Sequence, residues 1–424
     1  MSFSFDTTRY FAEQTDANDP LRAFRDRFHL PVQPNGQPYL YFCGNSLGLQ
    51  PKTAQGYIDQ ELKDWATLGV EGHFHAQHPW MPYHELLTGS MADLVGAKPL
   101  EVVIMNTLSV NLHLMMASFY RPTPTRFKIL IESDAFPSDR YAVASQAHFH
   151  GYDPQQAILN WRPRPSETLL RMEDLEDLLA REGESIALVL LGGVNYYTGQ
   201  AFDLKKITAL GHGYGCRVGF DLAHAAGNIP LHLHEDGPDF AAWCTYKYLN
   251  SGPGSVAACF VHERHANAFE LPRFAGWWGH NKNTRFNMRY DFDPMPGAEG
   301  WQLSNPPILS LAAIRASLDV FAASGMPALR QKSLSLTAYL EYLLQNLGNS
   351  RIRVVTPAEP EQRGCQLSIQ VLDADKALYQ SIGAAGIVAD WREPDVIRVA
   401  PTPLYNTYVE VFEFVERLQA LLAK

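Results

Sequence analysis

The middle of the chain alternates short runs of β-favouring residues with amphipathic helical segments. The β-favouring runs lie at 128–131, 186–191 and 217–220, and the helical segments lie near 172–181 and 204–212. Neighbouring parallel strands need a crossover connection, which is usually a helix, so repeated strand–helix units indicate a parallel sheet with helices on its faces. The sequence therefore predicts an α/β fold built around a mainly parallel sheet.

One pair of apolar runs departs from this alternation. The runs 241–246 and 256–262 are separated by a short segment that contains LNSGPGS. Because this segment is too short for a helical crossover, we expect the two runs to pair as antiparallel neighbours.

The two ends of the chain differ from the middle. Residues 1–40 are polar and interrupted by prolines, which is typical of an arm that wraps over a larger body. After residue 307 we expect helices at 309–323 and 328–347, strands at 352–355, 367–371 and 397–400, and a last helix with Val411, Val415, Leu418 and Leu422 on one face. We therefore expect an N-terminal arm (1–50) that joins a small domain, a large domain (51–305) and a C-terminal small α+β domain (306–424).

Two helices are expected before the first strand of the middle part. In 51–69 the apolar residues Ile58, Leu62 and Trp65 recur at helical spacing, which predicts an amphipathic helix with this face on a core. A second helix is expected at about 110–119.

Composition excludes several classes of protein. The 424 residues are 46% hydrophobic and 19% charged, and the net charge is −10, the wrong sign for a surface that binds nucleic acid by neutralising phosphates. No apolar run approaches the length of a membrane span, and the N-terminus lacks the pattern of a signal peptide. The five cysteines are odd in number and far apart, as expected of free thiols in a reducing compartment. We expect a cytoplasmic protein that binds neither nucleic acid nor membranes.

Asp221 ends a predicted strand in the segment GFDLAHAAG. The carboxyl ends of parallel strands form the ligand crevice of such a sheet, so this carboxylate is placed to act on a ligand. Capping of a following helix is an equally open interpretation of Asp221 by itself. His224 lies three residues further on, within reach of the same crevice.

Lys247 is the lysine with the most suggestive surroundings, because it follows an apolar run and stands between Tyr246 and Tyr248. A lysine held in an apolar site becomes a competent amine nucleophile, which imine formation with an aldehyde requires. Pyridoxal phosphate would need such a lysine, a carboxylate for its ring nitrogen, an aromatic face and a helix N-terminus for its phosphate.

Each of these parts has a candidate. Asp221 would contact the ring nitrogen, and Leu108 and Ser109 would offer a helix N-terminus to the phosphate, although by itself this segment favours an ordinary helix cap at Thr107 or Ser109. Phe136 in DAFPSDRYA would supply the aromatic face, and Asp139 in the same loop would add a polar contact.

A set of motifs spread in order over residues 41–406 resembles the kynureninase family. These motifs are YFCGNSLGLQPK, NLHLMMASFYRPTPTRFKIL, AFPSDRYA, GFDLAHAAGN, WCTYKYLNSGPGS, GWWGH, SNPPI and RVAPTPLYN. The resemblance implies a fold-type-I pyridoxal-phosphate enzyme, related to the class V aminotransferases, whose large domain has a mainly parallel seven-stranded sheet. It also implies hydrolysis of L-kynurenine, or of 3-hydroxykynurenine, to L-alanine and anthranilate or its hydroxy derivative.

The resemblance assigns roles position by position. Lys247 corresponds to the lysine that forms the Schiff base, Asp221 to the partner of the ring nitrogen, and Tyr246 to a phosphate ligand that also assists proton transfer. Arg398 corresponds to the arginine that holds the substrate carboxylate, a task suited to a planar bidentate donor. Further cofactor positions are Leu108, Ser109, Phe136, Pro137, Ser138, Asp139, His224, Trp277 and Asn305. Further substrate positions are Ser46, His73 and, again, Asn305.

The resemblance also implies a homodimer with active sites at the subunit interface, where the neighbouring chain supplies Trp277 and Asn305. No metal is implied, and the histidine clusters at 73–78, 148–150 and 232–234 lack the spacing of known metal motifs.

Two alternatives remain. A cysteine desulfurase or an aminotransferase would share the fold and the cofactor, although none of the cysteines lies on an evident mobile loop. A serine hydrolase is a remote alternative, because residues 44–48 fit the G-x-S-x-G pattern around Ser46. That pattern normally follows several strands, whereas here only a proline-rich arm precedes it.

Overall fold

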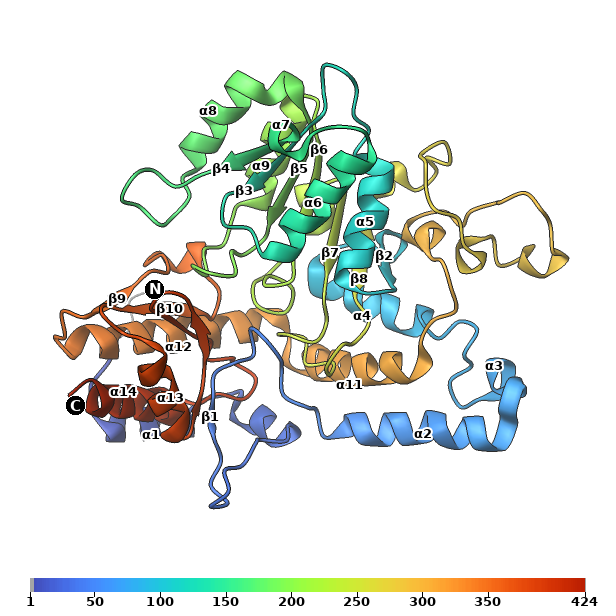
Figure 1. The fold of residues 1–424 in the computed structure, drawn as a ribbon. Coiled ribbons are helices and arrows are strands. Elements are labelled where there is room, and N and C mark those ends of the chain that lie inside the picture. Colours follow the sequence, from blue (N-terminus) through green and yellow to red (C-terminus); the bar gives the residue numbers. More distant parts are fainter. Residues whose placement is uncertain (1–3, 424) are drawn as a thin grey trace.

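A seven-stranded sheet forms the centre of the larger part of the molecule (Figure 1). The structure is a computed structural model, and it describes residues 4–423. The strand order is β2-β8-β7-β6-β5-β3-β4, with bounds β2 Val102–Ile104, β3 Lys128–Glu132, β4 Ile158–Trp161, β5 Ile186–Gly192, β6 Arg217–Asp221, β7 Phe240–Trp243 and β8 Ala258–Val261. Only β8 runs against its neighbours within this sheet. The mainly parallel sheet and the antiparallel pairing of 241–246 with 256–262 are therefore confirmed.

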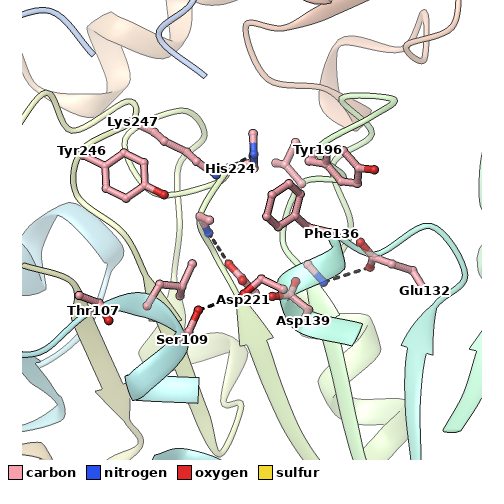
Figure 2. A pocket seen from close by; sticks show the side chains of 15 residues that line it. Thr107, Ser109, Glu132, Phe136, Asp139, Tyr196, Asp221, His224, Tyr246 and Lys247 are labelled. Atoms are coloured by element: carbon pink, nitrogen blue, oxygen red, sulfur yellow. Dashed lines mark hydrogen bonds between the residues drawn. The ribbon is translucent and has the colours of Figure 1, made fainter. Parts of the chain in front are cut away.

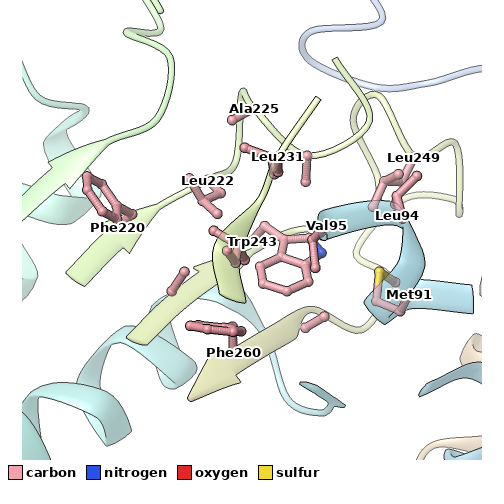
Figure 3. Close-up of a cluster of buried hydrophobic side chains, with 14 of the residues drawn as sticks. Met91, Leu94, Val95, Phe220, Leu222, Ala225, Leu231, Trp243, Leu249 and Phe260 are labelled. Carbon is pink, nitrogen blue, oxygen red and sulfur yellow. The ribbon is translucent and has the colours of Figure 1, made fainter. Parts of the chain in front are cut away.

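Helices cover both faces of this sheet, as the burial of successive residues along its strands requires. On β5, Leu188 and Leu190 join the cluster under α5 and α6, whereas Val189 and Leu191 join the cluster on the opposite face. Figure 3 shows that opposite face, where Trp243 and Phe260 of the sheet lie near Met91 and Val95 of α4. The helices of this part are α2 Thr53–Leu68, α3 Gly72–His75, α4 Glu85–Val95, α5 Leu108–Phe119, α6 Pro137–Phe149, α7 Pro154–Ala157, α8 Met172–Glu182, α9 Leu204–Gly213, α10 Leu233–Asp236 and α11 Ile308–Ser324.

A second, antiparallel sheet lies in the C-terminal part, with strand order β12-β13-β10-β9. Its bounds are β9 Ile352–Val354, β10 Leu367–Val371, β12 Asp390–Arg392 and β13 Val396–Val399, and the accompanying helices are α12 Met326–Asn346, α13 Lys376–Ala384 and α14 Tyr408–Leu422. Leu336 and Leu340 of α12 and Val411 and Leu418 of α14 share one apolar cluster with the buried side of this sheet.

The N-terminal segment is attached to this second sheet. Strand β1 (Leu40–Tyr41) pairs in parallel with β11 (Ile387–Val388). Helix α1 (Arg9–Ala17) packs on α14, where the Asp16 carboxylate accepts hydrogen bonds from the amides of Tyr408 and Val409 at 2.8 and 3.0 Å. These amides are the unpaired donors of the first turn of α14, so Asp16 helps to begin that helix.

Helix α11 packs with the large sheet although the sequence assigns it to the small domain. Its side chains Leu311, Ile314 and Leu318 belong to the core cluster of the large sheet, and the helix lies against α2 and α4. Helix α11 therefore contributes to the core around the large sheet, and the domain boundary expected after residue 305 stays a prediction.

Helix α2 is confirmed, but of its expected apolar face only Ile58 packs on the core. Leu62 and Trp65 are 40% and 63% exposed, whereas Glu61 and Asp64 are buried. The Glu61 carboxylate accepts hydrogen bonds from the Trp80 indole and the Tyr83 hydroxyl, at 3.0 and 2.9 Å. The buried side of α2 thus includes hydrogen-bonded carboxylates, which the spacing of hydrophobic residues does not reveal.

Short 3₁₀ helices connect the main elements, at Arg22–Arg27, Gly69–Glu71, Pro99–Glu101, Gly183–Ser185, Glu263–His265, Trp277–Gly279, Arg285–Asn287, Ala298–Trp301 and Pro360–Gln362. Within residues 4–423 no single helix has the length and apolar character to cross a membrane, and only the pair α11 and α12, bent by 80°, meets these criteria jointly.

Candidate active site

A cavity opens at the carboxyl ends of the parallel strands, where ligands bind in sheets of this kind. Strands β3, β5 and β6 end there at Glu132, Gly192 and Asp221 (Figure 2). The cavity holds about 740 Å³ of empty space, its open mouth included, which lies in the usual range for small-molecule sites. Other predicted residues that line it are Leu108, Ser109, Phe136, Ser138, Asp139, His224, Tyr246 and Lys247.

Two carboxyl groups meet on the floor of this cavity. Asp139 and Asp221 are hydrogen-bonded to each other, and Asp221 also accepts the backbone amide of Ala223 at 2.8 Å. Burial, followed by the neighbouring Asp221 charge, raises the pKa of Asp139 far above its usual range. Burial also raises the pKa of Asp221, but the Ala223 amide, the Lys247 charge and the Asp139 hydrogen bond oppose this rise. We therefore place the proton of the pair on Asp139 and the negative charge on Asp221.

Lys247 reaches the cavity from the loop after β7 and meets His224. The Lys247 Nζ lies 2.9 Å from His224 Nε2 (Figure 2). Burial, then the charge of Lys247, lowers the pKa of His224 well below its usual value, so the imidazole is neutral at pH 7. A neutral imidazole that accepts from the ammonium at Nε2 carries its own proton on Nδ1. That Nδ1 is buried and has no hydrogen-bond partner.

Two helix N-termini face the same cavity. Helix α5 begins at Leu108 after Thr107, whose side chain does not cap it, and α6 begins at Pro137 after Phe136, which also gives no side-chain cap. The hydroxyls of Ser109 and Ser138, one from each first turn, lie 3.0 Å apart. Free amides and helix dipoles at these ends favour an anionic ligand group.

Aromatic side chains form the walls of the cavity. Phe136 is 44% exposed and packs edge to face on Tyr196, with ring centroids 5.2 Å apart. Tyr246 stands opposite, and burial raises the pKa of its phenol, which therefore keeps its proton at neutral pH.

Arg398 and Ser46 form a second group beside this cavity. Arg398 is 1% exposed, lies on β13 and donates to the Tyr196 carbonyl at 2.6 Å and to the Ser46 hydroxyl at 3.4 Å. Because Tyr196 also lines the cavity, it connects the two groups. The guanidinium is paired with the carboxylate of Asp390, a residue that our sequence analysis did not identify.

Besides Arg398 and Ser46, four predicted residues do not line this cavity. Pro137 is the first residue of α6, between Phe136 and Ser138, which both line it. Trp277 and Asn305 are exposed on the surface, and His73 lies on α3 with its Nδ1 2.9 Å from the Val70 carbonyl.

Glu132 is a cavity residue that the sequence analysis missed. It ends β3 as Asp221 ends β6, so the rule that identified Asp221 could have found it. Its carboxyl accepts the Gly192 amide at 3.0 Å and the Asn195 side-chain amide at 3.3 Å. Burial raises the pKa of Glu132 to about 7. This group therefore holds the ends of β3 and β5 together and orients the loop that carries Tyr196.

Known relatives cover nearly the whole chain. A kynureninase from Myxococcus xanthus (strain DK1622) is 59% identical over 417 residues, which are 98% of this chain and 98% of the relative. A kynureninase from Koribacter versatilis (strain Ellin345) is 59% identical over 419 residues, 99% of each chain. This chain belongs to the kynureninase family. The family model of the kynureninase C-terminal domain matches residues 329–418, and the resemblance expected from the motifs is confirmed.

Solved structures show the fold that the kynureninase family shares with other enzymes. One is a C-DES mutant with glycine covalently linked to its pyridoxal phosphate cofactor. It aligns with this chain at a TM-score of 0.77 and 18% identity, and the alignment covers 93% of this chain and 98% of C-DES. Another is a cysteine desulfurase from Escherichia coli, which aligns at a TM-score of 0.77 and 17% identity over 95% of this chain and 98% of the desulfurase. At this identity the likeness concerns the fold alone, and it confirms the fold-type-I class.

The serine-hydrolase alternative does not fit a member of the kynureninase family, and local contacts explain its motif. The Ser46 hydroxyl donates to Asp390 at 2.7 Å, not to a histidine. A Cβ on Gly48 would lie 2.3 Å from the Lys247 carbonyl, and one on Gly44 would meet the Tyr405 hydroxyl at 2.4 Å. These glycines allow the N-terminal segment to approach the Lys247 loop closely.

Proposed function

We propose that this protein hydrolyses L-kynurenine, or its 3-hydroxy derivative, to L-alanine and anthranilate, or its hydroxy derivative, with pyridoxal 5′-phosphate as cofactor. The full-length relationship to kynureninases supports the reaction. The observation that carries the proposal is the grouping of Lys247, His224 and Asp221 in one cavity at the ends of the parallel strands.

The residues present fit the cofactor. The Nδ1 of His224 is buried without a partner, and the start of α5 has no side-chain cap; a ring with an anionic phosphate would supply a partner to each. Leu108, Ser109 and Tyr246 would hold the phosphate, Asp221 the ring nitrogen, and Phe136 and His224 the two ring faces. Pyridoxal phosphate, when bound, supplies a ring that accepts the electron pair left on the substrate when a bond next to its amino group is broken.

The chain's own residues would handle the protons. Lys247 Nζ, held by His224, is placed to take the proton from the substrate α-carbon and to return a proton. The Tyr246 hydroxyl is protonated at neutral pH and would accept the proton that the attacking water loses while passing its own proton on to the phosphate. Asp221 stays negatively charged, which favours a protonated ring nitrogen.

Arg398 would bind the substrate carboxylate. Its planar guanidinium offers donors in a fork that matches a carboxylate, and its buried Nε has no hydrogen-bond partner. Ser46 lies beside this guanidinium at 3.4 Å and would complete the substrate contact.

The visible spectrum and product fluorescence test this function together. We expect the protein with pyridoxal phosphate to show a visible absorption band and to produce anthranilate fluorescence when L-kynurenine is added. A band without fluorescence, together with activity on cysteine or a 2-oxo acid, would assign the chain to a sibling reaction. The absence of a band would contradict the cofactor assignment.

We further propose a homodimer in which the neighbouring chain supplies Trp277 and Asn305 to each site. The surface around Trp277 carries exposed apolar side chains, namely Phe274, Trp277, Phe286, Met288 and Tyr290, which is typical of a surface covered by another chain. The five unpaired cysteines, four of them buried, support a cytoplasmic location.

Subunit complementation tests the shared site. A mixed dimer of Lys247→Ala and Trp277→Ala chains would contain one site in which both residues are intact, because Lys247 and Trp277 come from different chains. We expect co-expressed variants to exceed the activity of either variant alone. Activity no greater than that of the separate variants would contradict a shared site.

A further inference from the structure

Three charged side chains lie together on the face of the small sheet that is directed at the cavity. Arg398 on β13 pairs in register with Asp390 on β12, and Arg392 follows two residues later on β12. Residues two apart on a strand point to the same side of a sheet, so these three side chains share one face. We call Arg392, Asp390 and Arg398 the carboxylate recess.

Asp390 is the shared counter-ion of the recess. Its carboxylate accepts from the guanidinium of Arg398, from Arg392 Nη2 at 3.1 Å and from the Ser46 hydroxyl at 2.7 Å. A half-buried carboxylate with three donors is held firmly, and it fixes in turn the orientation of both guanidiniums. Its pairing with Arg398 leaves Arg392 as the excess positive charge.

Both guanidiniums lie close to Tyr196, which also lines the cofactor cavity. The Cζ atoms of Arg392 and Arg398 are 5.7 and 5.9 Å from the centroid of the Tyr196 ring. The charges of both arginines also act on His224, where they help to lower its pKa after burial and Lys247. Arg392 is therefore directed toward the reacting groups, although 34% of its side chain is exposed.

The recess also contains hydrogen-bond donors that have no partner. The Nε atoms of both Arg392 and Arg398 are buried and have no hydrogen-bond partner. The formal charges of two guanidiniums and one carboxylate sum to about +1. One monoanionic carboxylate would make the recess neutral and would satisfy these donors.

We propose that Arg392 is a second cation for the substrate carboxylate beside Arg398, and that Asp390 is a positioning residue that orients both guanidiniums. This inference rests on the proposed function, because it assigns a contact to the α-carboxylate of the same substrate. The competing interpretation is that Arg392 only forms a surface ion pair with Asp390, and in that case its replacement would not affect substrate binding.

Steady-state kinetics of Arg392→Gln holoenzyme test the proposal. We expect KM for L-kynurenine to rise about tenfold or more, as the loss of a charge-assisted hydrogen bond implies, with kcat within about twofold. Arg392→Lys keeps the charge and loses the fork, and we expect an intermediate KM. Arg353→Gln is the matched control, because Arg353 lies exposed on β9 of the same sheet, and its KM should be unchanged.

A neutral analogue separates carboxylate recognition from a structural effect. The inhibition constant of L-kynurenine α-carboxamide should be nearly equal for the natural protein and Arg392→Gln, since the analogue lacks the negative charge. An inhibition constant that rises as much as KM, or a KM for Arg392→Gln within twofold of the natural protein, would overturn the inference. If the natural protein forms no anthranilate in the same assay, the proposed function fails and takes this inference with it.

Discussion

We expect Lys247→Ala to lower the rate of kynurenine hydrolysis by about 10³-fold or more, because it removes the amine that would attach the cofactor and move the α-proton. The fold should remain, since Lys247 lies at a cavity, where its side chain is hydrogen-bonded to His224. The measurement is kcat with L-kynurenine, combined with borohydride reduction in the presence of pyridoxal phosphate and mass analysis of the labelled peptide.

The matched control is Lys205→Ala, which removes an exposed lysine from α9. We expect this variant to keep full activity and to carry the cofactor on the peptide that contains Lys247. A Lys247→Ala protein that still traps the cofactor by reduction would show that another lysine was the true attachment site.

Much of the large sheet could be predicted from the sequence because its strands are buried on both faces. Such strands are continuous apolar runs, as in β5 and β6, and their spacing between helices reveals the parallel order. Strand β4 was missed because it is an edge strand with partly exposed residues, and α6 because its polar residues hide the helical period. Tertiary context, not local pattern, determines these two elements.

The candidate site divides in the same way. Asp221 and Lys247 were found because each follows an apolar strand, and chain order alone then places both at one edge of the sheet. Asp390 and Arg392 were not found, because a charged tripeptide resembles a solvated loop until its pairing with β13 is known. The role proposed for Trp277 lies in the site of a second chain, and contacts between chains leave no local pattern in the sequence.

Arg398→Ala should raise KM for L-kynurenine by about 10²-fold or more, because it removes the buried fork proposed to bind the substrate carboxylate. Pyridoxal phosphate affinity should change only a few-fold, since Arg398 contacts Tyr196, Ser46 and Asp390 and does not line the cofactor cavity. The measurements are KM by anthranilate fluorescence and cofactor binding by visible titration.

The same variant should also lose stability, because it takes one of two cations from the half-buried Asp390. Breaking a buried pair costs about 3–5 kcal/mol, and Arg392 remains as a partner at 3.1 Å, so we expect a loss at the lower end of that range. Arg353→Ala on the exposed β9 removes an arginine from the same sheet and should change neither KM nor the melting temperature. An unchanged KM in Arg398→Ala would move carboxylate recognition to Arg392 alone. A KM that rises by the same factor as the dissociation constant of the cofactor would mean that Arg398 only supports the fold of the site.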